Sequence, residues 1–128
     1  MGVPARLRPA PAAEVAAALA RRQQDAPDPD DEPLLVRHFL ALLVRDHPGA
    51  SVEVRVPPYA AVQCVAGARH TRGTPPAVVE TDAVTWIELC SGERDWAAAV
   101  SSGRLVASGQ RSDLSPLLDK FHRPANET

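Results

Sequence analysis

One short run of alternating residues constrains the fold more than any other feature of the chain. Residues 52–56 read VEVRV, so that valines and charged side chains alternate with a period of two. Side chains of an extended strand point alternately to its two faces, so the run predicts a strand with one covered and one solvated face. Pro57 and Pro58 end this strand, because proline has no backbone N–H to donate to a sheet.

A helix is expected over residues 33–46, immediately before this strand. Asp31 or Glu32 stands near its N-terminus, where a carboxylate interacts favourably with the helix dipole. The Pro-Gly pair at 48–49 stops the helix. Its broad apolar face consists of Leu34, Leu35, Phe39, Leu42 and Leu43.

A second amphipathic helix is expected near the end of the chain, with Ser112 as its N-cap. Its apolar residues fall at positions i, i+3, i+4 and i+7, which places them in one stripe that faces inward. That stripe consists of Leu114, Leu117, Leu118 and Phe121.

The segment between these helices contains further short elements. Residues 59–66 are apolar on both faces except at Gln63, which predicts a strand inside the sheet that is covered, at least in part, on both sides. The other expected elements are a strand over 77–81, a helix over 83–91 between Asp82 and Gly92, a short helix between Asp95 and Gly103, and a strand over 104–108.

The first 32 residues form an N-terminal arm. Residues 12–24 are rich in alanine and predict a helix, but only Val15 and Leu19 give it an apolar face, so it should dock weakly. Residues 25–32 hold five acidic residues and two prolines, a composition typical of a solvated linker. We therefore expect an arm and acidic, proline-rich linker over 1–32 and one folded domain over 33–122.

Composition excludes several classes of protein. The 128 residues suit one domain, and the net charge of -2 argues against nucleic acid as a partner. No run approaches the roughly 18 apolar residues of a transmembrane helix, and the basic start lacks the apolar stretch of a signal peptide, so we expect a cytoplasmic protein. Cys64 and Cys90 are far apart and favour two buried apolar thiols over a metal or redox site.

No catalytic or cofactor motif is present in the sequence. The chain lacks GxSxG, GxGxxG and GxxxxGK[ST], the motifs of a nucleophile elbow and of nucleotide-binding loops. His38, His47, His70 and His122 never stand at the i, i+4 spacing that places two metal ligands on one helix face. We therefore expect no metal, no cofactor and no enzymatic activity.

The densest group of polar side chains lies in the predicted loop RHTRGT, residues 69–74, followed by Glu80 and Asp82. Arginines of such a loop can clamp the oxygens of an anionic headgroup. They can equally pair with Glu80 or Asp82 and hold the loop in place. A small enzyme that uses His70 and these arginines is a further alternative.

Large apolar side chains also allow two interpretations. Trp86 and Trp96 fall on the two middle helices, where aromatic side chains commonly anchor a core. Trp86 can instead face a ligand. The stripe of the last helix is likewise either core or the lid of a tunnel.

The order of elements after Ser91 resembles that of the sterol carrier protein 2 superfamily. The segment GERDWAAAVSSGRLVASG, residues 92–109, followed by an apolar helix, carries this resemblance. VEVRVPP at 52–58, RHTRGTPP at 69–76 and VETD at 79–82 are similar to a small bacterial, mostly actinobacterial, branch called sterol carrier family proteins.

The resemblance implies an α/β fold of the α+β type: a twisted, largely antiparallel sheet of four to five strands with helices over one face. It also implies an apolar cavity for a lipid, fatty acyl or sterol-like molecule, and no cofactor. The cavity is expected to be lined by Leu35, Phe39, Leu43, Val62, Trp86, Leu114, Leu117, Leu118 and Phe121. Arg69, His70, Arg72 and Glu80 would stand at its mouth. A protein-interaction or regulatory module with a filled core is the alternative.

Overall fold

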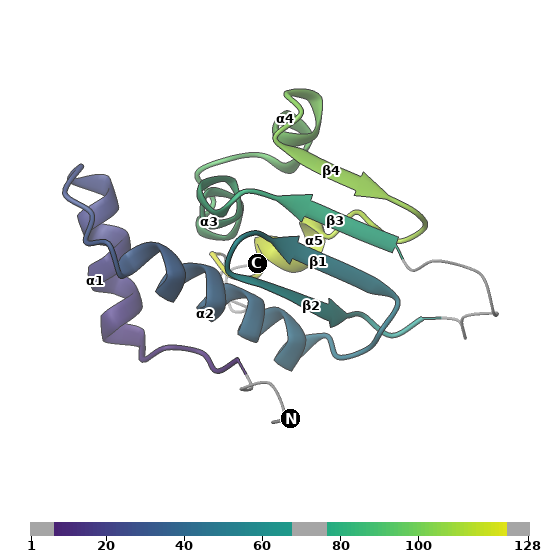
Figure 1. Ribbon diagram of the computed structural model, residues 1–128, viewed down its shortest axis with the longest axis horizontal. Coiled ribbons are helices and arrows are strands. Elements are labelled where there is room, and N and C mark those ends of the chain that lie inside the picture. The colour runs from purple at the N-terminus through teal and green to yellow at the C-terminus, as the bar shows by residue number, and fades with distance from the viewer. Residues whose placement is uncertain (1–6, 68–76, 123–128) are drawn as a thin grey trace.

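The computed structural model describes residues 7–67 and 77–122. Its strands form one four-stranded mixed sheet. The strand order is β2-β1-β3-β4, which Figure 1 shows from bottom to top. The β1–β2 and β3–β4 pairs are antiparallel, whereas β1 and β3 run parallel. The strands are β1 (Val52–Val56), β2 (Ala60–Cys64), β3 (Ala77–Thr81) and β4 (Leu105–Ser108).

Five helices accompany this sheet in the described segments. They are α1 (Ala12–Gln23), α2 (Asp31–Asp46), α3 (Ala83–Ser91), α4 (Trp96–Ser101) and α5 (Ser115–Asp119). The predicted mixed α+β architecture with a largely antiparallel sheet is confirmed, since two of the three strand pairs are antiparallel. Within these segments, no helix has the length and apolar character needed to cross a bilayer.

The two faces of the sheet differ as the alternation in β1 predicts. Val52, Val54 and Val56 are fully buried in the core, together with residues of α2, α3 and α5. Glu53 and Arg55 point to the other face, where Arg55 Nε donates to Glu53 Oε2 at 2.6 Å. The helices therefore cover one face of the sheet, and the other face carries Glu53, Arg55 and Glu80 together with Val78 and the exposed Val106.

The prediction that residues 59–66 form an interior strand is wrong, because β2 is an edge strand. The strand that follows β2, which is β3, pairs with the opposite side of β1, so β2 has one neighbour among the described strands. Ala61 and Gln63 are exposed, and the strand is shorter than predicted. It ends before Val65, whose φ of 66° leaves the extended conformation.

A salt bridge that the sequence analysis did not anticipate joins α1 to α2. Arg21 Nη2 and Nε donate to the two carboxylate oxygens of Asp31 at 2.7 and 2.8 Å, and the Asp28 N–H donates to the same group at 2.9 Å. These bonds, with that from Arg21 as the largest cause, lower the pKa of Asp31 to about 2. Helix α2 begins at Asp31, two residues earlier than predicted. Ala18 of α1 is fully buried against the core.

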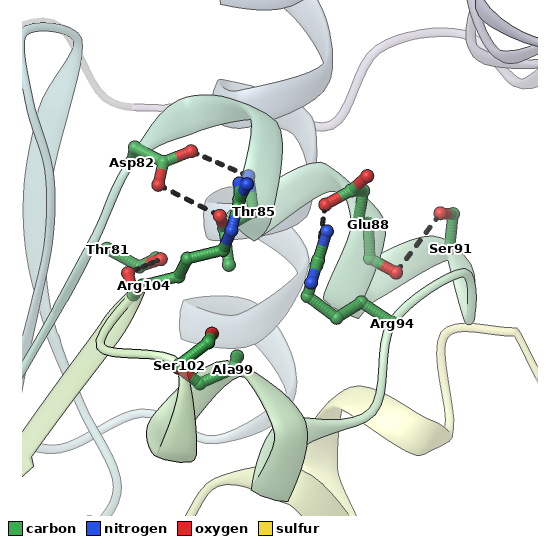
Figure 2. Close-up of polar contacts among 9 residues, drawn as sticks. All are labelled: Thr81, Asp82, Thr85, Glu88, Ser91, Arg94, Ala99, Ser102 and Arg104. Atoms are coloured by element: carbon green, nitrogen blue, oxygen red, sulfur yellow. Dashed lines mark hydrogen bonds and ion pairs between the residues drawn. The ribbon is translucent and has the colours of Figure 1, made fainter.

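Helices α3 and α4 have the N-caps that the sequence predicts. Asp82 accepts the Thr85 backbone N–H at 2.8 Å and the Thr85 hydroxyl at 2.8 Å, as Figure 2 shows. Asp95 accepts the Ala98 N–H at 3.2 Å. Gly92 ends α3 in the left-handed conformation at φ 87°. A Cβ there would lie 2.8 Å from His122 Nδ1, so this turn requires glycine.

The last helix is shorter than predicted, and Ser112 does not cap it. The Ser112 hydroxyl donates to the Gly109 carbonyl at 2.9 Å, while Asp113 Oδ1 accepts the Ser115 N–H at 3.0 Å. These local bonds form a turn before the helix, so α5 begins only at Ser115. Within the predicted stripe, Leu114 and Leu118 are buried, whereas Leu117 and Phe121 are partly exposed.

Candidate ligand-binding groove

Most of the predicted cavity residues meet in the hydrophobic core. Phe39 of α2 and Phe121 after α5 stack with their ring centroids 5.8 Å apart, so the structure brings the two expected walls together. Trp86 is fully buried, and its Nε1 donates to the Val36 carbonyl at 3.3 Å. Leu35, Leu43, Leu114 and Leu118 are buried in the same cluster, and Leu117 packs against it. Their role in ligand binding stays a prediction.

The predicted polar mouth is only partly within the described residues. Arg69, His70 and Arg72 lie outside them, and so does the predicted contact of this loop with Glu80. Glu80 itself lies on the solvated face of β3, where its Oε1 is 3.9 Å from Arg55 Nη1.

Val62 packs against the same core and also lines a surface groove of about 1100 Å³ between α2 and β2. One wall comes from α2, where Arg37, Ala41, Val44 and Arg45 stand at positions i, i+4, i+7 and i+8 and so share one helix face. Because β2 is the edge strand among the strands that the structure describes, its outer side forms the opposite wall. The groove is lined by Leu7, Arg8, Pro9, Arg37, Ala41, Val44, Arg45, Tyr59, Ala60, Ala61, Val62 and Gln63.

Residues 7–9, which precede α1, line part of the groove and are anchored to α2. The Ala10 backbone N–H donates to His38 Nδ1 at 2.9 Å. This bond requires a neutral imidazole with its proton on Nε2, because a protonated Nδ1 cannot accept. Burial, and then the charge of Arg45, lower the pKa of His38 below its usual 6.5, which favours that neutral form.

The groove combines an apolar lining with positive charge. Arg8, Arg37 and Arg45 line it, and none of the lining residues that the structure describes is acidic. Arg45 Nε donates to Asp46 Oδ1 at 2.9 Å, so its charge is partly compensated. Within the described segments, Arg8 and Arg37 make no salt bridge.

Tyr59, the residue before β2, lines the groove and is held in place by a hydrogen bond. Its hydroxyl donates to Glu32 Oε2 at 2.5 Å, and this bond is the main cause of a raised pKa of the phenol. The positive charge of Arg37, which also lines the groove, opposes that rise. The lining of the groove thus includes the phenol of Tyr59, which is bound to the Glu32 carboxylate, and the guanidinium of Arg37.

A second hollow, of about 360 Å³, lies where α3, α4 and α5 meet, and it is more polar. Asp95, Asp113 and Asp119 line it together with His122, and Leu118 is the one predicted cavity residue there. The His122 Nε2 atom is 3.6 Å from Asp119 Oδ1. Among residues 7–67 and 77–122, no three His, Cys, Asp or Glu side chains are placed to hold a metal ion.

Of the groove residues, the sequence analysis singled out only Val62 as a ligand contact. The sequence pattern that could have indicated the α2 wall of the groove is the spacing of Arg37, Ala41 and Arg45, which lie four residues apart on one face of α2. Small residues on that face leave room that leucine would fill. Recognising it as a groove required knowing that β2 is at the sheet edge.

Comparison with known families identifies the fold's relatives. Residues 30–119 match the family described as "Bacterial SCP ortholog", a span that runs from the start of α2 to the end of α5. A search of curated proteins found no significant match. The predicted resemblance to sterol carrier proteins is confirmed at this level, while the narrower actinobacterial branch stays a prediction. The chain therefore belongs to the family of bacterial SCP orthologs.

Proposed function

We propose that this protein binds and carries an apolar small molecule of the lipid class, without catalysis, in the groove between α2 and β2. The observation that carries the proposal is the apolar lining of this groove in a member of an SCP family. Ligand pockets commonly enclose roughly 300–1,000 Å³, so a groove of about 1100 Å³ is ample for one acyl chain or one compact lipid.

The physical drive for binding comes from apolar side chains that the fold leaves partly exposed. Val44 of α2 and Val62 of β2 are both incompletely buried, as are Leu7 and Ala60. Covering such surface is favourable by roughly 25 cal/mol per Å² of apolar area. A hydrocarbon ligand that lies along the groove covers both walls at once.

The groove is a better site than the space between α2 and α5. Leu35, Leu43 and Trp86, which were expected to line a cavity, are fully buried in the core, and Phe39 and Phe121 stack directly. A ligand between α2 and α5 has to displace these contacts, whereas the groove is already open at the surface. We therefore place the carried molecule against β2.

Titration with the neutral apolar dye N-phenyl-1-naphthylamine tests the proposal. Val44→Trp fills the groove from the α2 wall, and Val62→Trp fills it from the β2 wall. Val100→Trp is the matched control, since Val100 is an exposed valine of α4. Thermal melts of all variants check that each is folded.

We expect saturable fluorescence enhancement with the parent protein and with Val100→Trp, and loss of most of it in both groove variants. Equal dye binding in all four proteins would place the apolar site elsewhere. No saturable binding by the folded parent protein would overturn the carrier function and leave the interaction module as the better account.

A further inference from the structure

We infer that the outer edge of β2 is a docking site for an extended segment of another protein, which adds to the sheet as a further strand and carries acidic side chains four residues apart. The inference goes beyond the proposed function and does not depend on it, because it uses backbone groups of β2 that a hydrocarbon leaves unused. A docked segment lies in the groove between α2 and β2, so it and a lipid exclude each other.

The groove follows the edge of β2 rather than one of its faces. Residues 59–63 all line it, although successive side chains of a strand point to opposite faces of a sheet. Among the described strands, β2 pairs with β1 alone. Every second residue of such an edge strand directs its N–H and C=O groups away from the sheet, which makes the edge a template for another strand.

Helix α2 runs beside β2 in the same direction, as Figure 1 shows. At the start of both elements, the Tyr59 hydroxyl donates to Glu32 Oε2. At their ends, the Val65 N–H donates to the His47 carbonyl at 2.7 Å. The groove is therefore bounded along its length by a helix on one side and a strand edge on the other, which is the shape that an added strand requires.

Arg37 and Arg45 mark two positions along this groove. They lie eight residues apart on one face of α2, which corresponds to about 12 Å at a rise of about 1.5 Å per residue. In a strand, residues i and i+4 point to the same side and lie about 13 Å apart. Two acidic side chains at that spacing can therefore reach both guanidinium groups, which bind carboxylates well.

The other charges at the groove favour an acidic partner as well. Arg8 adds a third guanidinium, and none of the described lining residues is acidic. The two carboxylates close by already have partners, because Glu32 accepts the Tyr59 hydroxyl and Asp46 accepts Arg45 Nε–H. Positive charge is thus concentrated here although the whole chain has a net charge of -2.

The charge pattern also argues for a segment that comes from a different protein. The parts of this chain outside the described residues, namely 1–6, 68–76 and 123–128, contain one acidic residue, Glu127, so none of them supplies the required pair. A second copy of this chain that docks edge to edge through β2 places one arginine-lined groove against another. Repulsion between these like charges opposes such a dimer.

Fluorescence anisotropy with synthetic peptides tests the inference. The probe is a short rhodamine-labelled peptide of alternating threonine and valine, in which two threonines four residues apart are replaced by glutamate. One control peptide has glutamine at both positions. A second has its two glutamates five residues apart, which places them on opposite sides of a strand. A third has proline in place of two valines, which removes N–H donors needed for pairing.

The proteins are the parent, the double variant Arg37→Gln/Arg45→Gln, and the control Arg104→Gln. The control removes an exposed arginine that does not line the groove. Thermal melts check that each variant is folded. Each peptide is used below the concentration at which it aggregates, and the neutral dye is titrated with the same protein samples.

We expect saturable binding of the glutamate peptide by the parent protein and by Arg104→Gln. Exposed ion pairs each change affinity by roughly 1.5- to 5-fold, so the double variant should bind this peptide about 2- to 25-fold more weakly. The parent should bind all three control peptides more weakly than the glutamate peptide. Amide hydrogen exchange at residues 60–64 should slow when the glutamate peptide is bound, because the peptide covers the outer edge of β2.

The outcomes separate this inference from the proposed function. Equal affinity for the glutamate and glutamine peptides would overturn the charge match, and equal affinity for the proline peptide would overturn strand addition. Dye binding without peptide binding would end this inference and leave lipid carriage intact, whereas peptide binding without dye binding would do the reverse. A parent protein that sediments as a dimer, with a tighter dimer in Arg37→Gln/Arg45→Gln, would assign the edge to a second copy instead.

Discussion

Truncation of Phe121 measures how firmly the last helix is attached to the core. Full burial of a phenylalanine contributes about 1.5–3 kcal/mol, and Phe121 is partly buried, so roughly half of that applies. Its stack on Phe39, with centroids 5.8 Å apart, adds about 0.5–1.5 kcal/mol. Phe121→Ala should therefore lower the free energy of unfolding by about 1.25–3 kcal/mol.

Urea unfolding followed by circular dichroism measures this loss as a lower midpoint with an unchanged slope. Phe121→Leu is the control, since it keeps an apolar side chain but removes the ring stack, and it should cost less than Phe121→Ala. A loss below about 0.5 kcal/mol in Phe121→Ala, the range of ordinary surface substitutions, would refute the packing argument. Dye binding should be unchanged in both variants. A changed dye affinity would place the ligand under α5.

Three further predictions concern single sites. Acidification should release residues 7–10, because the Ala10 N–H donates to a neutral His38. The pKa of His38 is lowered in the folded protein, so the stabilisation from this bond is present above about pH 6.5 and is lost as the pH falls through the lower pKa of the folded state. The NMR resonance of the Ala10 amide should shift with the titration of His38, and an amide resonance that stays constant through that titration would contradict the prediction. Asp82→Ala removes the cap of α3 and should cost about 0.5–2 kcal/mol in a denaturant melt, whereas Asp82→Asn should restore most of it; equal losses would show that capping is not the cause. Burial raises the pKa of the Cys64 thiol to about 11, and it also raises the pKa of the Cys90 thiol. Both cysteines should therefore react with a thiol reagent only after denaturation. Rapid labelling of the native protein would disprove their burial.

The sequence was a good guide wherever a local pattern determines the structure. The alternation at 52–56 depends only on the two faces of a strand, and the caps Asp82 and Asp95 depend on the backbone three residues away. Helix α2 was predicted for the same reason, apart from its first turn. That turn is held by Arg21, ten residues earlier in the chain, and no local pattern reports such a contact.

Non-local arrangement accounts for the errors. The composition of β2 is that of an interior strand, but its place at the edge follows from where the chain crosses to β3. The stripe from Leu114 to Phe121 has helical spacing, yet the bonds of Ser112 and Asp113 form a turn that shortens α5. The groove was missed because it lies between two elements whose adjacency the sequence does not reveal. The division of the chain at residue 32 stays a prediction.

Photo-cross-linking tests the central claim, that a lipid lies between α2 and β2, most directly. A long-chain fatty acid with a diazirine in its chain is bound to the folded full-length protein, irradiated, and mapped by mass spectrometry of the digested product. We predict cross-links to residues 37–45 and 59–63, and their suppression by excess laurate. Cross-links confined to residues 114–121 would contradict the groove and return the ligand to the space beneath α5.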